Sequence, residues 1–358
     1  MHTTITLVEY AQSVLQAGAN HTQWAIRFAA AEALAALGDA SRMEDLQQGA
    51  ASPDSFIRQR AIVSLDKLQA PALHDLFARA TRDESSAVSA AALEALAGIG
   101  DKACLSFIKT GLQDGDSSIQ LAAVRSLGIL GKVGTPLLKA IATGQKYDCN
   151  YVIRLKAIAE LVRLGNPAGK RELLELLQAH DLWIAFLAAQ QLALLGDHQG
   201  VPQLKEMLRL GQWAEKIAAL ESLLQLGIQQ NLADTIYRDR DASQPDEIVQ
   251  VEAIRVLDRL MPETTAARLQ QMWQSQDEEV KFKVLDVIGE LGRPGLIAVT
   301  GNLLSKGPEY LRAKLVMVID HIGDPELLPN LAPVLEKSHW LLRLQAARVT
   351  VRLGRMIL

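Results

Sequence analysis

Residues 153–167 read IRLKAIAELVRLGNP, and the chain returns to this pattern at a nearly fixed interval. An apolar, helix-forming stretch ends at Gly165, and other glycines follow similar stretches along the chain. Successive glycines of this kind lie 31 or 34 residues apart, or the sum of two such steps: Gly38, Gly100, Gly131, Gly165, Gly196, Gly227, Gly292, Gly323 and Gly354. A repeat of this length is typical of a solenoid, in which stacked units share one continuous core.

Two gaps in this series are twice as long as the rest. Placing Gln69 and Met261 in them divides the chain into eleven units, which we expect to form one repeat domain over residues 1–358. The three extra residues of the two longer units are expected near residues 144–150 and 240–247. The units end near residues 38, 69, 100, 131, 165, 196, 227, 261, 292, 323 and 354.

Apolar residues recur one, four, eight and twelve positions before each unit end, and alanine dominates the third of these positions. This spacing places them on one face of a helix. Aspartates fifteen positions before five unit ends can cap the helix start, and the glycine can end the helix in the left-handed conformation. The aspartates are Asp54, Asp116, Asp181, Asp246 and Asp277. In each unit, we expect a shorter helix to precede this second helix.

Several segments carry a resemblance to a known family. Ile57–Ala61 (IRQRA), Ile153–Ala157 (IRLKA) and Leu164–Pro167 (LGNP) resemble HEAT repeats, and most of all the short HEAT-like repeats named after phycobilin lyases. The resemblance implies an all-α fold, a right-handed α-solenoid of about eleven two-helix repeats of 31–34 residues, with the second helices lining the concave face. Its members include lyases and adaptors, so the fold alone does not define a function.

Composition narrows the setting. The chain has 358 residues, 49% of them hydrophobic, and a net charge of −4, which disfavours a general nucleic-acid binder. Two cysteines in no metal or redox spacing suit a reducing compartment. We find neither a basic, apolar leader at the start nor an apolar run long enough for a membrane span, so we expect a cytoplasmic protein without membrane contact.

A row of basic residues lies eleven positions before the unit ends. Because this position is near the buried face of the helix, we expect these side chains to pair with acidic groups at the turns of neighbouring units. They would fix unit geometry and would not contact a ligand. The row comprises Arg27, Arg58, Arg154, Lys216, Lys281, Arg312 and Arg343.

A polar stripe occupies positions nine, six and two before the unit ends. It holds six acidic residues, Glu32, Glu94, Glu221, Glu252, Asp286 and Glu290. Its charge of +5 suggests an acidic protein partner; the alternative is an ordinary solvated face with a chance imbalance. The eleven basic residues are Arg60, Lys67, Arg125, Lys156, Arg163, Arg255, Arg259, Lys283, Lys314, Arg348 and Arg352.

The middle of the stripe is apolar. The sixth unit presents Leu187, Gln190 and Leu194, with Trp183 one turn earlier on the same face. An apolar centre with charged flanks is typical of a protein-binding surface; the alternative is that curvature buries these side chains between units. The predicted partner-binding residues are these four together with Arg125, Lys156, Arg163, Arg255 and Arg259.

No catalytic arrangement stands out in the sequence. The histidines are scattered over different units, without HxxxH, HExxH or GxSxG spacing. We therefore assign no catalytic, cofactor-binding or metal-ligating residue. Aromatic residues before the second helices, such as Phe56 and Tyr310, are interpreted as staples of the chain entry. The apolar end, residues 355–358, predicts a covering partner, a second copy of the chain or a longer natural chain.

The sequence thus predicts a non-enzymatic HEAT-like scaffold or adaptor that binds a protein on the face of its second helices. A lyase-like role in handling a bilin chromophore is an alternative that rests on the family resemblance. Nucleic-acid binding on the basic stripe is a third interpretation, which the net negative charge of the chain disfavours.

Overall fold

The computed structural model describes residues 4–100, 104–144, 151–228 and 246–357. All regular structure in these residues is helical, which confirms the all-α prediction. Eleven of the described helices correspond to the predicted second helices: α2 (Trp24–Ala36), α4 (Ser55–Asp66), α6 (Ser86–Ile99), α8 (Ser117–Ile129), α10 (Tyr151–Arg163), α12 (Leu182–Leu194), α14 (Trp213–Gln225), α16 (Glu247–Leu257), α18 (Glu278–Leu291), α20 (Glu309–Ile322) and α22 (Trp340–Gly354).

A shorter helix precedes most of them, but the first helix of the chain, with 16 residues, is longer than α2, with 13. In several repeats a 3₁₀-helix of three or seven residues comes before the first α-helix, namely η1 (Pro71–Leu73), η3 (His198–Gly200), η4 (Pro294–Thr300) and η5 (Pro325–Leu331). The first helices themselves are α1 (Thr4–Ala19), α3 (Met43–Ala50), α5 (His74–Ala80), α7 (Leu105–Gly111), α9 (Thr135–Ala142), α11 (Pro167–Leu176), α13 (Val201–Leu210), α17 (Pro262–Trp273), α19 (Leu303–Lys306) and α21 (Ala332–Lys337).

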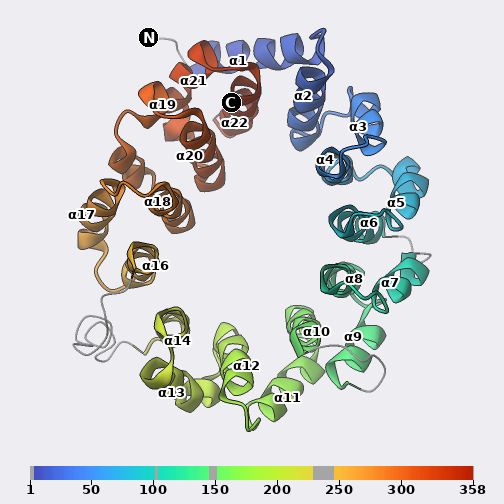
Figure 1. Cartoon of the computed structure of the whole chain (residues 1–358), viewed down its shortest axis with the longest axis vertical. Coiled ribbons are helices and arrows are strands. Elements are labelled where there is room, and N and C mark those ends of the chain that lie inside the picture. The colour runs from blue at the N-terminus through green and yellow to red at the C-terminus, as the bar shows by residue number, and fades with distance from the viewer. Residues whose placement is uncertain (1–3, 101–103, 145–150, 229–245, 358) are drawn as a thin grey trace. The chain divides into compact units, whose positions relative to one another are not determined.

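The chain divides into two compact units, residues 34–192 and residues 1–33 with 193–358. In the first of these, α4 packs on α6, α6 on α8 and α8 on α10, and each also packs on the shorter helix of its own repeat. The second helices of this unit therefore form one layer and the first helices another, as Figure 1 shows for α3 to α10. A single repeat domain, its handedness and its concave face stay predictions.

The other unit combines the two ends of the chain. Its second helices pack in succession from α14 through α16, α18 and α20 to α22, and α1 packs along α22. The glycines at this contact allow close approach, because a Cβ on Gly18 would lie 2.6 Å from Leu344 and one on Gly354 would lie 2.4 Å from Val8. The face of α22 is thus covered by α1 of the same chain, while Met356 and Ile357 are exposed.

The unit ends adopt the predicted backbone conformation at nine positions. Eight glycines have φ between +58° and +80°, and Gln69 reaches +47° as the one non-glycine residue with positive φ in the described segments. Met261, the unit end without a glycine in the other long gap, has φ −140°, because a new helix starts directly after it at Pro262. The prediction is wrong at Gly354, which ends α22 as a helical residue and allows close packing on α1 instead.

The helix starts agree with the aspartate pattern. The carboxylates of all five predicted caps accept a backbone N–H two or three residues further on, at 2.7 to 2.8 Å. The alanine row lies in the core, where Ala61, Ala92, Ala123 and Ala157 are fully buried, and this lets neighbouring second helices approach closely. Most of the two segments expected to hold the extra residues lies outside the described residues, as does Cys149, whereas Cys104 is buried.

Candidate partner-binding surface

One face of the second helices carries most of the exposed large apolar side chains. We call it the second-helix stripe and define it as positions thirteen, nine, six and two before each unit end. In the described residues it holds nine of the fifteen exposed large hydrophobic residues, although these positions make up only 4 in 31: Phe56, Val63, Ile129, Val152, Trp183, Leu194, Tyr310, Met317 and Leu341. Exposed apolar residues that gather on one face mark an interaction surface.

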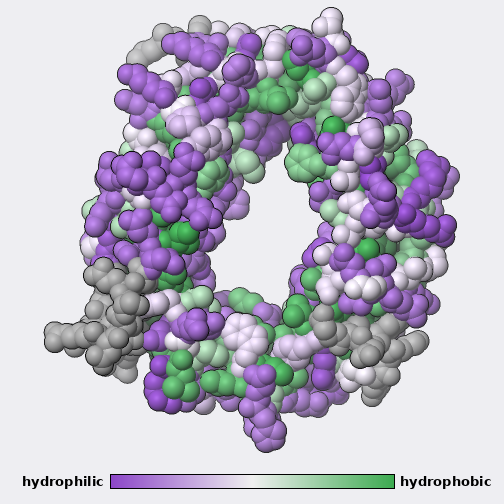
Figure 2. Space-filling view, in the orientation of Figure 1, coloured by the Kyte–Doolittle hydropathy of each residue, from purple (hydrophilic) through white to green (hydrophobic). Residues whose placement is uncertain are grey.

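The predicted apolar centre lies on α12. Trp183 is 47% exposed and Leu194 59% exposed, while Leu187 and Gln190 between them are half-buried. The Trp183 ring packs against Phe186 at 5.6 Å, which supports its position from below while its outer face stays in solvent. The alternative that these four side chains are buried between repeats is therefore wrong for Trp183 and Leu194. Figure 2 shows how hydrophobic residues alternate with hydrophilic ones on the visible surface of the described chain.

In the compact unit of residues 34–192, the predicted cations form ion pairs with carboxylates of the same chain. Arg125 on α8 donates to Glu94 on α6 at 2.6 Å. Lys156 and Arg163 on α10 both reach the buried carboxylate of Glu160, at 3.0 and 2.7 Å. Gly128 makes room for this cluster, because a Cβ there would lie 2.2 Å from a Glu160 oxygen. These cations lie on the stripe but are partly neutralised.

Arg255 is the centre of a similar network of ion pairs in the compact unit of residues 1–33 and 193–358. Its two terminal nitrogens donate to the carboxylate of Glu221 at 2.8 Å, and its Nε lies 2.5 Å from Glu252 and 3.2 Å from Glu290. The hydrogen bonds to Glu221 raise the pKa of Arg255, and the same contact lowers the pKa of Glu221. Arg259, just beyond α16, is exposed and adds a weaker attraction to Glu221.

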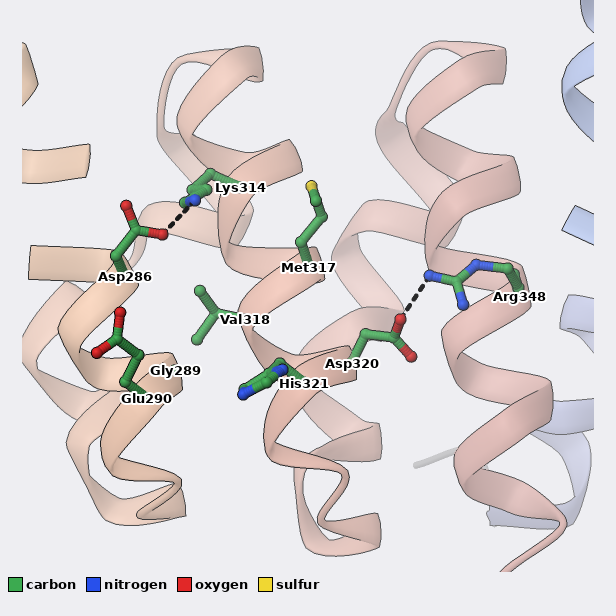
Figure 3. A pocket seen from close by; sticks show the side chains of 9 residues that line it. All are labelled: Asp286, Gly289, Glu290, Lys314, Met317, Val318, Asp320, His321 and Arg348. Carbon is green, nitrogen blue, oxygen red and sulfur yellow. Dashed lines mark hydrogen bonds and ion pairs between the residues drawn. The ribbon is translucent and has the colours of Figure 1, made fainter. Parts of the chain in front are cut away.

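The network continues toward the end of the chain, where Figure 3 shows a groove on α18, α20 and α22. Lys314 reaches Asp286 on the preceding helix, and Arg348 reaches Asp320 at 2.6 Å. Val318 faces the space left by Gly289, and Met317 stands exposed at the rim. Ion pairs therefore link successive second helices across the stripe and leave apolar side chains between them.

These contacts revise the charge expected from the sequence. The charge of +5 counts only the residues nine, six and two positions before the unit ends. Glu160, five positions before its unit end, and Asp320, three positions before its own, are therefore not included. Their side chains nevertheless reach the stripe cations, since residues three and four apart share a helix face. The charge separation that suggests an acidic partner is therefore smaller than the sequence count.

The basic row, in which Arg58 is buried and the others are half-buried, contributes structural contacts. Arg58 donates to both oxygens of Asp83 in the next unit, at 2.8 and 2.9 Å, and to the carbonyls of Ser52 and Pro53. Hydrogen bonds from Arg58 hold the pKa of Asp83 below its usual value. Arg343 differs from the expectation because it donates to the Leu335 carbonyl and to the Tyr10 hydroxyl. The row thus mixes ion pairs with caps on backbone carbonyls.

The aromatic residues expected before the second helices lie in the first turns of these helices, and two of them contact neighbouring repeats. Tyr310 stacks on Phe282 of the preceding second helix at 5.8 Å and donates to Glu278. Tyr151 donates to the Ile184 carbonyl of the following repeat at 3.3 Å, and burial raises its pKa to about 12. Phe56, in contrast, is 62% exposed and belongs to the free part of the stripe.

Comparison with known proteins agrees with this architecture. The family model for HEAT repeats matches residues 8–66, 73–147 and 135–224, which together are more than half of the chain. The chain belongs to the HEAT-repeat family. None of the helices in the described segments combines the length and apolar character needed to cross a membrane.

A short stretch is similar to a curated protein. It is 38% identical over 69 residues to the phycocyanobilin lyase subunit alpha of Picosynechococcus sp., and this match covers 19% of the chain and 26% of the relative. This similarity confirms the resemblance to repeats of the phycobilin-lyase type. The chain spans about a quarter of the length of that relative.

Two solved structures match most of the chain at low similarity. One is a complex of CpcE and CpcF of phycocyanin lyase from Nostoc sp., with 16% identity, a TM-score of 0.36 and coverage of 73% of this chain and 95% of that one. The other is human deoxyhypusine hydroxylase in complex with glycerol, with 18% identity, a TM-score of 0.30 and coverage of 72% and 97%. Neither likeness is close enough to transfer a function.

Proposed function

We propose that this protein is a non-enzymatic HEAT-repeat scaffold that binds a protein partner on the second-helix stripe. The observation that supports it is the concentration of exposed apolar side chains on this one helix face, with Trp183 and Leu194 on α12 as anchors. Large aromatic side chains dominate binding energy when a partner excludes water from them. Because internal carboxylates pair with many stripe cations, apolar contact supplies most of the affinity and an acidic patch on the partner adds the smaller part.

A matched pair of leucines tests this function. Leu194 ends second helix α12 on the stripe and is 59% exposed, whereas Leu210 ends first helix α13 and is 55% exposed. Tagged wild type, Trp183→Ala, Leu194→Ala and Leu210→Ala would be used to capture partners from the native organism, with quantitative mass spectrometry as readout. We expect one specific partner to be depleted by the first two substitutions and retained by Leu210→Ala.

The size of the effect follows from the anchor role of Trp183. Its replacement by alanine is expected to weaken the purified complex by about 2 kcal/mol or more, while helical circular dichroism and the thermal midpoint stay as in wild type. Equal capture by all four proteins would reject the stripe as the docking face. Equal loss in Leu210→Ala would do so too, because that side chain lies off the stripe.

A second candidate function rests on the similarity to a phycocyanobilin lyase subunit. In this case the protein would handle a bilin together with partner subunits, and the stripe would contact one of them. Coexpression with a bilin and its apoprotein separates the two functions. Covalent attachment, seen as visible absorption that persists after denaturation and depends on this chain, would favour chromophore handling over a plain scaffold.

A further inference from the structure

A groove of about 530 Å³ crosses the stripe in the unit of residues 34–192. Its floor is α6, whose outward side chains are short: Ala87, Ala90 and Ala91. Val63 on α4 and Leu121 on α8 line the two sides. The groove exists because α6 carries alanines where α12 carries Trp183 and Leu187, so a partner can approach the backbone of α6 closely.

The charges of the groove are not balanced. Arg125 is paired with Glu94, at 2.6 Å between Nε and Oε1. Asp66, at the end of α4, accepts a hydrogen bond from the Gln69 side chain at 3.0 Å and forms no ion pair with a described residue. Burial raises the pKa of the Asp66 carboxyl, and nearby Glu94 adds to this rise, whereas the hydrogen bond from Gln69 and the charge of Lys67 oppose it in part. The groove thus holds two carboxylates and one guanidinium.

These features specify the chemistry of an occupant. A strip of apolar side chains would cover the alanine floor, and a cation would compensate Asp66. Among the usual peptide-recognition modes, a polyproline segment needs an aromatic-lined groove and an added strand needs an open sheet edge. The groove lining contains neither, whereas an amphipathic helix presents apolar residues at i, i+3, i+4 and i+7 to a groove of this kind.

We propose that the groove between α4 and α8 receives an amphipathic helix of a partner protein, with a lysine or arginine of that helix paired to Asp66. This inference rests on the proposed function as a docking scaffold and adds the chemistry of the partner. It reverses the sign of charge expected from the sequence, because the carboxylate without an ion pair in this groove calls for a basic partner residue.

Peptide selection on the full-length protein tests the proposal. The probe is a displayed library of 16-residue helical peptides, randomised on one face. We expect enriched peptides to carry an apolar i, i+3, i+4, i+7 pattern with a lysine or arginine beside it. Their dissociation constants are expected to rise about tenfold or more with Ala91→Trp, which fills the groove, and about tenfold with Asp66→Asn.

Matched controls separate the groove from general effects. Ala40→Trp adds the same bulk at an exposed turn, and Glu175→Gln removes one exposed charge on α11; both are expected to bind as wild type does. Replacing the basic peptide residue by glutamine should cost as much as Asp66→Asn, and the two changes together should cost little more than either alone. If Ala91→Trp lowers the thermal midpoint, Ala87→Phe near the start of α6 replaces it.

Several results would overturn the proposal. These are a selection that yields no peptide or only acidic ones, peptides that bind Ala91→Trp as tightly as wild type, and additive costs for Asp66→Asn and the peptide change. Such failures leave the scaffold function standing, because that function is judged by capture of a native partner with Trp183→Ala and Leu194→Ala. Loss of the native partner in those variants without any effect of Asp66→Asn would confine docking to α12.

Discussion

At the scale of single residues, the repeat is fixed by backbone conformation and by short polar contacts. The glycines and aspartates that mark helix ends and starts could be predicted because each acts on its own nearest backbone. The partners of the stripe cations could not, since Glu160 and Asp320 lie off the counted positions and reach across by side-chain length. The spacing of residues thus predicts caps better than ion pairs.

A glycine at a unit end should be costly to replace. Gly165 has φ +66°, and a Cβ at this position would have no neighbouring atom within 4 Å, so Gly165→Ala suffers only from the left-handed backbone. We expect a loss of about 1 kcal/mol in the free energy of unfolding, measured by urea denaturation. Gly115→Ala is the control, because that site is equally open and lacks positive φ. Equal stabilities of the two variants would refute the backbone explanation.

The pair of Arg58 and Asp83 predicts a pH-dependent contribution to stability. Asp83 has a lowered pKa in the folded protein, so its contribution is complete above the ordinary aspartate value of about 4 and is lost as the pH falls through the folded value. Asp83→Asn should therefore cost about 1 to 3 kcal/mol at pH 7 and progressively less in acid. Denaturation of both proteins across pH 7 to 2.5 measures this difference.

Glu84 provides the matched control for that experiment. It lies 3.2 Å from the same guanidinium, but its side chain is 86% exposed. Glu84→Gln should change stability by less than about 0.5 kcal/mol at any pH, because solvent screens an exposed pair. A destabilisation by Asp83→Asn that stays constant with pH would point to lost packing and not to the ion pair.

At the scale of helices, the contact between α1 and α22 is the least expected feature. Packing between residues 4–19 and 340–354 leaves no trace in the repeat period, and the sequence suggests a cover only for the apolar end, residues 355–358, where Met356 and Ile357 are exposed. The first helix instead packs along α22, with close contacts at two glycines. In the sequence, Gly354 is one member of the repeat spacing and Gly18 is an ordinary small residue. Their role in close packing becomes clear only from the contact between α1 and α22.

Substitution at this contact should weaken one unit selectively. Gly18→Val and Gly354→Val would push side chains into Leu344 and Val8, and overpacking of this kind costs about 1 to 3 kcal/mol. We expect faster amide hydrogen exchange in α1 and α22, with α6 and α8 unchanged. Gly295→Val, at an open position of the same unit, is the control. Unchanged exchange in α22 would show that α1 does not protect it.

At the scale of the whole molecule, the repeat and its two-helix units could be predicted from the sequence, and membership of the HEAT-repeat family confirms them. Of the four predicted α12 residues, Trp183 and Leu194 are exposed, whereas Leu187 and Gln190 are half-buried, and the charge of the stripe is partly compensated by carboxylates outside the counted positions. The identity of a partner depends on the side chains exposed on the surface, and the repeat spacing of the sequence does not predict these. The proposed docking face therefore rests on where the exposed apolar residues lie.

Hydroxyl-radical footprinting of the protein with its captured partner tests the docking face most directly. Oxidation of Phe56, Trp183 and Met317 on the stripe should be compared with that of Leu210 and Met356, which are equally exposed off the stripe. We predict that binding protects at least Trp183 several-fold and leaves Leu210 and Met356 unchanged. Protection of Leu210 or Met356 with full oxidation of the stripe residues would contradict docking on the stripe.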